Sequence, residues 1–201
     1  MLITTVDRKP SGSRYKALPE LFGEVGVPEK FDGADAQATA FLCYSSGTTG
    51  LPKGVMTTHF NLTSQHQCCR VSYPVIESGK DVVLGVLPFS HVYGLAVILM
   101  NPLLSGVPVV VLPRWDEIVA LKAIERFKVT YALLVPPILI NLLHSKNMAN
   151  FNISSLNTII CAAAPLSPDL QRAFQKRVPG VYLFQGYGTS MQELNEPADF
   201  V

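Results

Sequence analysis

The sequence predicts an α/β fold in which a mainly parallel β-sheet carries helices on both faces. Six short apolar runs have the length of buried strands, at residues 40–44, 82–87, 107–112, 130–135, 156–161 and 181–184. Two segments with one apolar helical face, 116–128 and 167–178, separate neighbouring runs. Continuous apolar strands that alternate with one-sided helices are typical of parallel sheets with right-handed crossovers.

Each of the two helices has its own sequence signature. In the first, Ile118 lies outside the expected apolar face, which consists of Val119, Ala120, Ala123, Ile124 and Phe127. In the second, Ser167 is the expected N-cap and Pro168 suits the first helical position. Leu170, Phe174 and Val178 then recur every fourth residue, so they predict the buried face.

Residues 82–113 contain no Asp, Glu, Lys or Arg, and a membrane span has to be weighed against a buried segment. Prolines and polar residues interrupt this stretch, at Pro88, His91, Asn101, Pro102 and Pro108. Because no uninterrupted piece approaches the roughly 20 residues that a span needs, we expect a buried strand, helix and strand instead.

Composition excludes some classes of partner. Hydrophobic residues make up 48% of the 201-residue chain and charged residues 15%, against about 25% charged residues in an average soluble domain. Sixteen Lys and Arg against fifteen Asp and Glu leave a net charge of +1. We therefore expect no nucleic-acid partner and no attraction to an acidic membrane.

The most informative segment is Tyr44–Gly54, which reads YSSGTTGLPKG and follows a predicted strand. Glycines allow backbone N–H groups to approach an anion, hydroxyls add donors, and Lys53 adds a positive charge, so the segment suits phosphate. Pro52 before Lys53 and Gly54 after it break the Walker A spacing. The alternative is a mobile linker.

Three further segments lie at or just beyond predicted strands. Residues 87–94 read LPFSHVYG, and His91 is placed where open parallel sheets form ligand crevices, although a lone histidine is more often structural. Residues 162–166 read AAAPL, whose small side chains leave room for a flat ring or simply pack closely. Residues 185–188 read QGYG, in which Tyr187 offers an aromatic face.

These four segments, in this order, resemble the core motifs of the adenylate-forming (AMP-binding) ligase superfamily. The 4-coumarate:CoA ligase and acyl-CoA synthetase branch is the most similar. The resemblance implies a fragment of the large N-terminal domain of such an enzyme, with ATP and Mg²⁺ as cofactors and CoA as co-substrate. It implies that the chain is part of a ligase that converts an aryl or fatty carboxylic acid into an acyl-adenylate and then into an acyl-CoA thioester.

The resemblance also implies roles for individual residues. His91 and Lys53 would be catalytic, and the acyl group would contact His91, Tyr93 and Gly94. Arg114 matches a basic position that contacts CoA. The nucleotide would contact Ser45, Ser46, Gly47, Thr48, Thr49, Gly50, Lys53, Ala163, Gln185, Gly186, Tyr187 and Ser190.

The sequence departs from the family pattern after Gly188, where a Thr and then a magnesium-binding Glu are expected. Without a gap, Ser190 takes the Thr position and Met191, a poor ligand for a hard cation, takes the Glu position. With a two-residue insertion, Glu193 supplies the acid and Gln192 replaces the Thr. Glu193 is therefore the candidate metal ligand under only one of the two alignments.

We expect three regions: an irregular lead-in at 1–38, a partial adenylation domain at 39–188 and a divergent tail at 189–201. The family's small C-terminal domain, which carries the catalytic lysine, has no counterpart, so we expect the isolated chain to be inactive or a weak nucleotide binder. A non-catalytic nucleotide-binding or interaction module derived from such a ligase is the alternative. A phosphotransferase is disfavoured because no Walker B-like acid follows a strand. We also expect self-association through exposed sheet edges.

The expected location is intracellular and cytoplasmic, with the peroxisome as an alternative for a full-length relative. Residues 1–10 lack an apolar core of signal-peptide length. The four cysteines, Cys43, Cys68, Cys69 and Cys161, show no C-x-x-C pair and no metal-ligand spacing. We expect them to be free thiols in a reducing compartment.

Overall fold

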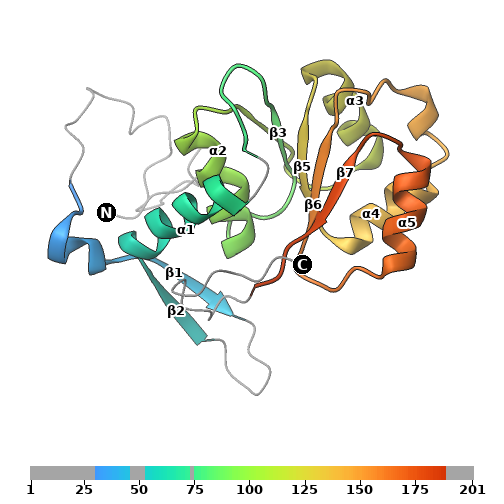
Figure 1. The fold of residues 1–201 in the computed structure, drawn as a ribbon. Coiled ribbons are helices and arrows are strands. Elements are labelled where there is room, and N and C mark those ends of the chain that lie inside the picture. Colours follow the sequence, from blue (N-terminus) through green and yellow to red (C-terminus); the bar gives the residue numbers. More distant parts are fainter. Residues whose placement is uncertain (1–29, 46–52, 73–74, 189–201) are drawn as a thin grey trace, which may run out of the picture. The chain divides into compact units, whose positions relative to one another are not determined.

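The computed structural model describes residues 30–45, 53–72 and 75–188, apart from the side chains of Ser45, Lys53 and Ser72 (Figure 1). The first described element is the short 3-10 helix Gly33–Gln37. Among the described residues, no helix has both the length and the apolar character needed to cross a bilayer.

The central element is a five-stranded parallel sheet with the order β4-β3-β5-β6-β7. Its strands are β3 (Val83–Gly85), β4 (Val109–Val111), β5 (Tyr131–Leu134), β6 (Thr158–Cys161) and β7 (Tyr182–Gln185). Each of the five overlaps one of the predicted apolar runs. The predicted parallel sheet is therefore confirmed, although four of the five strands are shorter than the runs.

The sixth predicted strand forms, but it is not part of this sheet. β1 (Thr39–Ser45) pairs antiparallel with β2 (Lys53–Thr58) in a separate two-stranded sheet. The prediction that residues 40–44 are buried is wrong, because Leu42 and Tyr44 are exposed and Cys43 alone is fully buried. In a two-sided antiparallel ribbon, alternate side chains face away from the core even when the run reads as continuously apolar.

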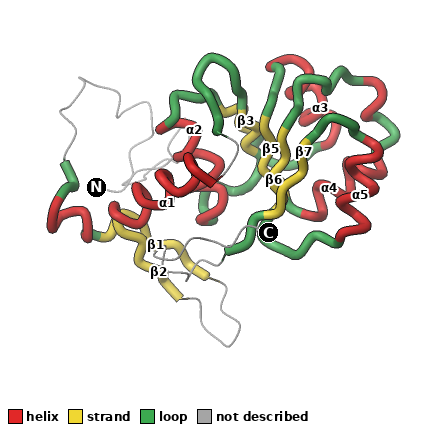
Figure 2. Tube along the Cα trace, in the orientation of Figure 1, coloured by secondary structure: helices red, strands yellow, loops and turns green. Residues whose placement is uncertain are grey.

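Helices cover both faces of the five-stranded sheet (Figures 1 and 2). On one face, α3, α4 and α5 pack over a core that contains Leu84, Leu134, Ile159 and Phe174. On the other face, the π-helix Tyr93–Met100 packs through Ile98 against a second core, which contains Val83, Leu133 and Ile160. The remaining bounds are α1 (His59–Ser72), α2 (Asn101–Leu104), α3 (Glu117–Phe127), α4 (Pro136–His144), the 3-10 helix Met148–Asn150 and α5 (Pro168–Arg177).

Strand alternation divides the buried side chains between the two faces. Successive residues of a strand point to opposite faces, so each strand supplies both cores. The face under α3, α4 and α5 receives Leu84, Ala132, Leu134, Ile159, Cys161 and Leu183, and the π-helix face receives Val83, Tyr131, Leu133 and Ile160. A sheet covered on both faces is thus confirmed.

The uncharged stretch 82–113 forms the predicted strand, helix and strand. β3 leads into the π-helix, α2 follows without interruption, and β4 returns the chain to the sheet beside β3. The Asn101 backbone N–H donates to the Ala96 carbonyl at the junction between the two helices. Pro102 lies at the start of α2, where a missing N–H is tolerated.

The helix caps agree with the sequence, but the predicted buried face of α3 is displaced. Asp116 Oδ1 accepts from the Val119 N–H at 3.0 Å, and Ser167 Oγ accepts from the Leu170 N–H at 3.2 Å, so the predicted Ser167 cap is confirmed. In α3, Val119 and Phe127 are exposed, whereas Leu121 is fully buried. The face turns by about one position because Leu121 and partly buried Ile118 are also apolar and compete for the core.

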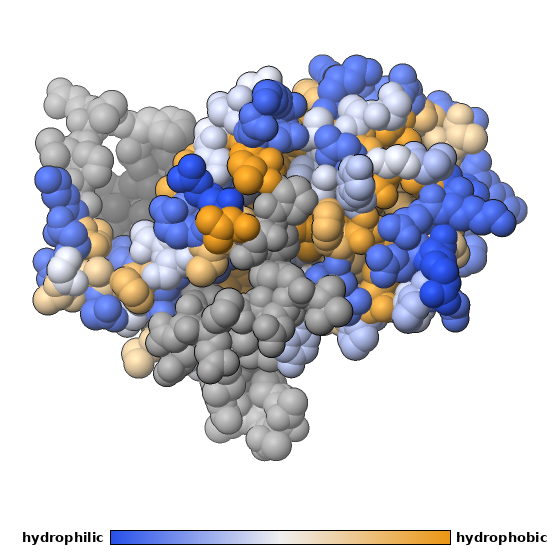
Figure 3. All heavy atoms as spheres, viewed as in Figure 1, coloured by the Kyte–Doolittle hydropathy of each residue, from blue (hydrophilic) through white to orange (hydrophobic). Residues whose placement is uncertain are grey.

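One face of the edge strand β7 remains open within the described part of the chain. Tyr182 and Phe184 are exposed there, whereas Leu183 between them is buried under the helices. In Figure 3, hydrophilic residues cover the outer side of the α5 region and hydrophobic residues are exposed nearer the middle of the view. Self-association through such an edge stays a prediction.

Two phenylalanines, one buried on α5 and one exposed on α3, give a matched pair of stability predictions. Phe174 is 1% exposed and Phe127 is 48% exposed. Phe174→Ala should lower the free energy of unfolding by about 3–5 kcal/mol, as is usual for a buried phenylalanine. Phe127→Ala should cost less than about 1 kcal/mol. Urea unfolding followed by circular dichroism measures both, and a larger loss for Phe127→Ala would contradict the assignment of the buried face.

Candidate functional site

Parallel pairing brings three of the predicted segments to one edge of the sheet. The segments 87–94, 162–166 and 185–188 lie at or after the carboxyl ends of β3, β6 and β7. In an open parallel sheet, these ends point to the same edge, which is where ligands bind. The register aligns Leu134 with Cys161 and Cys161 with Gln185, so β5, β6 and β7 end side by side.

A backbone bond joins the segments that follow β6 and β7. The Gly186 N–H donates to the Cys161 carbonyl at 2.9 Å, and the Ala162 N–H donates to the Leu134 carbonyl at 3.1 Å. These bonds continue the ladder past the last residue of each strand. Ala163 and the Gln185–Tyr187 segment are consequently neighbours at the carboxyl edge.

Ala163 has an unusual backbone conformation at this edge. Its φ is +70°, in the left-handed region, although it carries a Cβ. That region costs a non-glycine residue roughly 1–2 kcal/mol, and such residues cluster at ligand sites. The Ala163 side chain is exposed, so the strained turn presents backbone and a small methyl group to the solvent. That a flat group slides past these small side chains stays a prediction.

The aromatic ring of Tyr187 is accessible beside this turn. Tyr187 is 72% exposed, Gly186 is buried and Gln185 is partly buried. An exposed phenol ring has its face available for stacking on another planar group. The Gln185 and Gly186 backbone is anchored by the β6 ladder, so the ring extends from a fixed point.

His91, Tyr93 and Gly94 form a compact corner after β3. The His91 N–H donates to the Pro88 carbonyl, and His91 Nδ1 accepts from the Tyr93 N–H, both at 3.2 Å. Tyr93 Oη donates to the Ile160 carbonyl at 3.2 Å and so ties the π-helix to β6. His91 itself is exposed to solvent. The corner therefore connects the segment 87–94 to β6, the strand that precedes Ala163.

Arg114 lies apart from the segments after β6 and β7, although β4 is the direct neighbour of β3. It follows β4, which lies at the opposite edge of the described sheet from β7. Four strand spacings of about 4.8 Å place these two strands roughly 19 Å apart. Arg114 is exposed. A role in binding CoA stays a prediction for this residue.

The predicted phosphate segment is described only at its two ends. Ser45 and Lys53 are partners in the β1–β2 register, so the strands bring the two ends of the segment together. Ser46, Gly47, Thr48, Thr49 and Gly50 lie outside the described residues, as do Ser190 and Glu193. The roles predicted for these residues stay predictions.

The described residues do not provide a magnesium site. No group of three or more His, Cys, Asp or Glu side chains gathers within the described ranges. Hard cations such as Mg²⁺ need oxygen ligands, and carboxylates are the usual protein donors. Glu193, the predicted ligand, lies outside the described residues, so magnesium binding stays a prediction.

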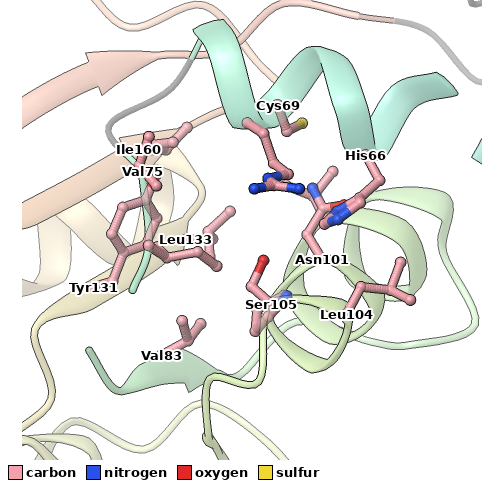
Figure 4. A pocket seen from close by; sticks show the side chains of 14 residues that line it. His66, Cys69, Val75, Val83, Asn101, Leu104, Ser105, Tyr131, Leu133 and Ile160 are labelled. Atoms are coloured by element: carbon pink, nitrogen blue, oxygen red, sulfur yellow. The ribbon is translucent and has the colours of Figure 1, made fainter. Parts of the chain in front are cut away.

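A cavity of about 260 Å³ lies beside this site and was not predicted. It is bounded by α1, α2, the π-helix and the strands β3, β5 and β6, as Figure 4 shows for the labelled side chains. Sequence reasoning missed it because α1 was not predicted. One signal was present: His66, Cys69 and Arg70 have the i, i+3, i+4 spacing of a single helix face. The lining consists of His66, Cys69, Arg70, Val75, Ile76, Val83, Val97, Asn101, Pro102, Leu104, Ser105, Tyr131, Leu133 and Ile160.

A polar cluster joins α1 to α2 at the cavity wall. His66 Nδ1 donates to Asn101 Oδ1 at 3.1 Å, and both side chains are buried. Gln65 Nε2 donates to Cys69 Sγ at 2.9 Å. Burial raises the pKa of the Cys69 thiol to about 11, although a hydrogen bond with Asn101 opposes that rise. Cys69 is therefore a neutral thiol at physiological pH and is not an activated nucleophile.

The fold and the carboxyl-edge segments define a class of nucleotide-dependent enzyme. The model of the AMP-binding enzyme family matches residues 3–190, so the chain belongs to this family. Two curated relatives are similar in sequence. Rice 4-coumarate–CoA ligase 1 is 42% identical over 88% of this chain. A Bacillus subtilis long-chain-fatty-acid–CoA ligase is 35% identical over 81% of this chain. The crystal structure of ATP-bound MatB from Rhodopseudomonas palustris covers 79% of this chain, with a TM-score of 0.70 and 28% identity.

The chain spans only part of these proteins. It covers 31% of the length of the rice ligase, 29% of the Bacillus ligase and 30% of the MatB chain. The predicted resemblance to the superfamily, and to its 4-coumarate:CoA and acyl-CoA ligase branch, is confirmed by these relatives. Their activities belong to chains about three times as long.

The corner after β3 depends on the absence of a side chain at Gly94. A Cβ at this position would overlap the carbonyl group of Pro88, whose oxygen also accepts from His91. Gly94→Ala should therefore lower stability by about 1–3 kcal/mol, as overpacking does. In Gly54→Ala, the nearest atom to the new Cβ is Tyr44 Cζ at 3.4 Å, so this control should lose less than about 1 kcal/mol. Equal melting temperatures for the two variants would contradict the close approach.

Cysteine reactivity tests the polar cluster. Burial raises the pKa of Cys161 as well as that of Cys69 to about 11, whereas Cys68 is exposed. At pH 8, only about one in a thousand of the two shielded thiols is ionised, so iodoacetamide should modify Cys68 first. Mass spectrometry of the digested protein measures the order. In the control variant Cys68→Ser, only slow modification of the shielded thiols Cys69 and Cys161 should remain. Fast labelling of Cys69 would show that the polar cluster does not bury its thiol.

Proposed function

We propose that this chain is part of an ATP-dependent carboxylic acid:CoA ligase and supplies part of its nucleotide and acyl site. The observation that carries the proposal is the juxtaposition of the strained Ala163 turn and the exposed Tyr187 ring, joined through the Gly186–Cys161 bond. Together they offer a slot for a planar base and an aromatic face to stack on it. Membership of the AMP-binding enzyme family supports the same ligand.

The proposed reaction has two halves. In the first, a substrate carboxylate attacks the α-phosphorus of ATP, the bond to the β-phosphate oxygen breaks, and acyl-adenylate and pyrophosphate result. In the second, the CoA thiol attacks the acyl carbon, loses its proton and displaces AMP. Negative charge develops on phosphate oxygens in the first half, and fixed donors at that position lower its barrier.

Residues of this chain would supply those donors. In the proposal, Lys53 and the Thr48 and Thr49 hydroxyls contact the phosphates, while Ala163 and Tyr187 hold the adenine. His91 and Tyr93 border the acyl group; support comes from the Tyr93 bond to Ile160, which places this corner against β6. No step is assigned to Mg²⁺, whose predicted ligand Glu193 lies outside the described residues.

We propose that the isolated chain binds nucleotide without turning it over. This second candidate is a nucleotide-binding module. The proposed adenylation region is 39–188, with 1–38 as a lead-in and 189–201 as a tail. A cytoplasmic location is proposed with it. Pyrophosphate release from ATP and a carboxylic acid would identify an enzyme, and binding without release would identify the module.

Removing the predicted phosphate donors tests the proposal. Each hydrogen bond to a charged group contributes roughly 1.5–3 kcal/mol, so Lys53→Ala combined with Thr48→Ala and Thr49→Ala should weaken ATP binding at least about tenfold. Isothermal titration calorimetry measures the dissociation constant. The matched control is Lys80→Ala with Thr63→Ala, which removes an exposed lysine and an exposed threonine elsewhere. Unchanged ATP affinity in a folded triple variant would refute the proposed phosphate site.

A further inference from the structure

The cavity has two chemically different walls (Figure 4). The sheet contributes Tyr131, Leu133 and Ile160, which belong to the core on the π-helix face. The helices α1 and α2 contribute the polar side chains of His66, Cys69, Arg70, Asn101, and the adjoining Ser105. A pocket of this kind buries an apolar body against one wall and fixes a polar group at the other.

The polar wall presents positive charge and hydrogen-bond donors. None of the 14 lining residues is Asp or Glu, and Arg70 carries the permanent charge. No described side chain pairs with the Arg70 guanidinium, and the Ser105 hydroxyl likewise has no partner within the described ranges. Figure 4 shows the Ser105 oxygen directed into the cavity. A guanidinium matches a carboxylate through two parallel hydrogen bonds.

The cavity extends away from the carboxyl edge of the sheet. Ile160 lies near the carboxyl end of β6 and accepts the Tyr93 hydroxyl, so it links the cavity to the proposed acyl-binding corner. Val83 and Tyr131, which also line the cavity, are the first residues of β3 and β5. A molecule that reacts at the carboxyl edge would therefore point its other end into the cavity.

We propose that the cavity binds the far end of the acyl substrate and that Arg70 selects acids with a second carboxylate there. This inference rests on the proposed ligase function and names its substrate class: a dicarboxylic acid with an apolar spacer. The volume of about 260 Å³ exceeds the roughly 150 Å³ of an engineered apolar cavity that holds benzene. The space suits a short diacid of about six carbons in total. Arg70 is thus a specificity-determining residue, assisted by the Ser105 hydroxyl.

The test compares hexanedioate with hexanoate, which differ in the far-end carboxylate. Titration calorimetry on the full chain should show at least tenfold tighter binding of hexanedioate. Arg70→Met should abolish that preference, Ser105→Ala should reduce it several-fold, and Arg70→Lys should restore part of it. Arg172→Met is the matched control, because Arg172 is exposed on α5 and paired with Asp169, so the preference should remain.

Three results would overturn the inference. They are an unchanged preference in Arg70→Met, no preference in the unmodified chain, and no binding of either acid at millimolar concentration. The first of these includes equal weakening of both acids in Arg70→Met, because Arg70 would then hold the reacting carboxylate. ATP titration of the same samples separates the two proposals. Absence of a dicarboxylate preference in the unmodified chain, with intact ATP binding, rejects this inference alone, and an Arg70-dependent preference without ATP binding rejects the ligase function.

Discussion

Parallel pairing of β5, β6 and β7 is the constraint on which the site depends. The hydrogen-bond ladder holds Leu134, Cys161 and Gln185 in line, and it continues into the bonds made by the Ala162 and Gly186 N–H groups. Residues more than twenty positions apart in sequence therefore meet at one edge. Without that register, the Ala163 turn would have no support for its left-handed backbone, and Tyr187 would have no fixed base.

The same ladder also shapes the cavity. Because side chains alternate along a strand, Leu134 and Ile159 are committed to the core under α3, α4 and α5, while Leu133 and Ile160 face the opposite side. On that side, the cover comes from the π-helix, α2 and α1, and it leaves space unfilled. Ile160 on β6 contributes to both places. Its carbonyl accepts from the Tyr93 hydroxyl at the corner after β3, and its side chain lines the cavity.

Much of the fold could be predicted from the sequence, because continuous apolar runs and one-sided helices identify a parallel sheet directly. The prediction failed where burial depends on tertiary partners. Residues 40–44 are as apolar as the central strands, yet they pair in a separate two-stranded sheet and not in the covered one, and Tyr44 is 68% exposed. The buried face of α3 shifted because Leu121 and Phe127 are equally apolar and only packing decides between them. α1 carries few apolar residues, so neither α1 nor the cavity beside it was predicted. The candidate residues at the carboxyl edge could be identified because they lie in a local pattern of glycine, small and aromatic residues.

The most direct test of the account is a nitrogen-15 NMR titration of the whole chain with ATP. The central claim is that nucleotide binds at the carboxyl edge of β6 and β7. It predicts that the largest shift changes occur together in residues 162–166 and 185–188, and that the amides in the last turn of α3, which leads to the amino end of β5, stay unchanged. Saturable changes elsewhere with both segments unaffected would contradict the claim, whatever the affinity measured for ATP.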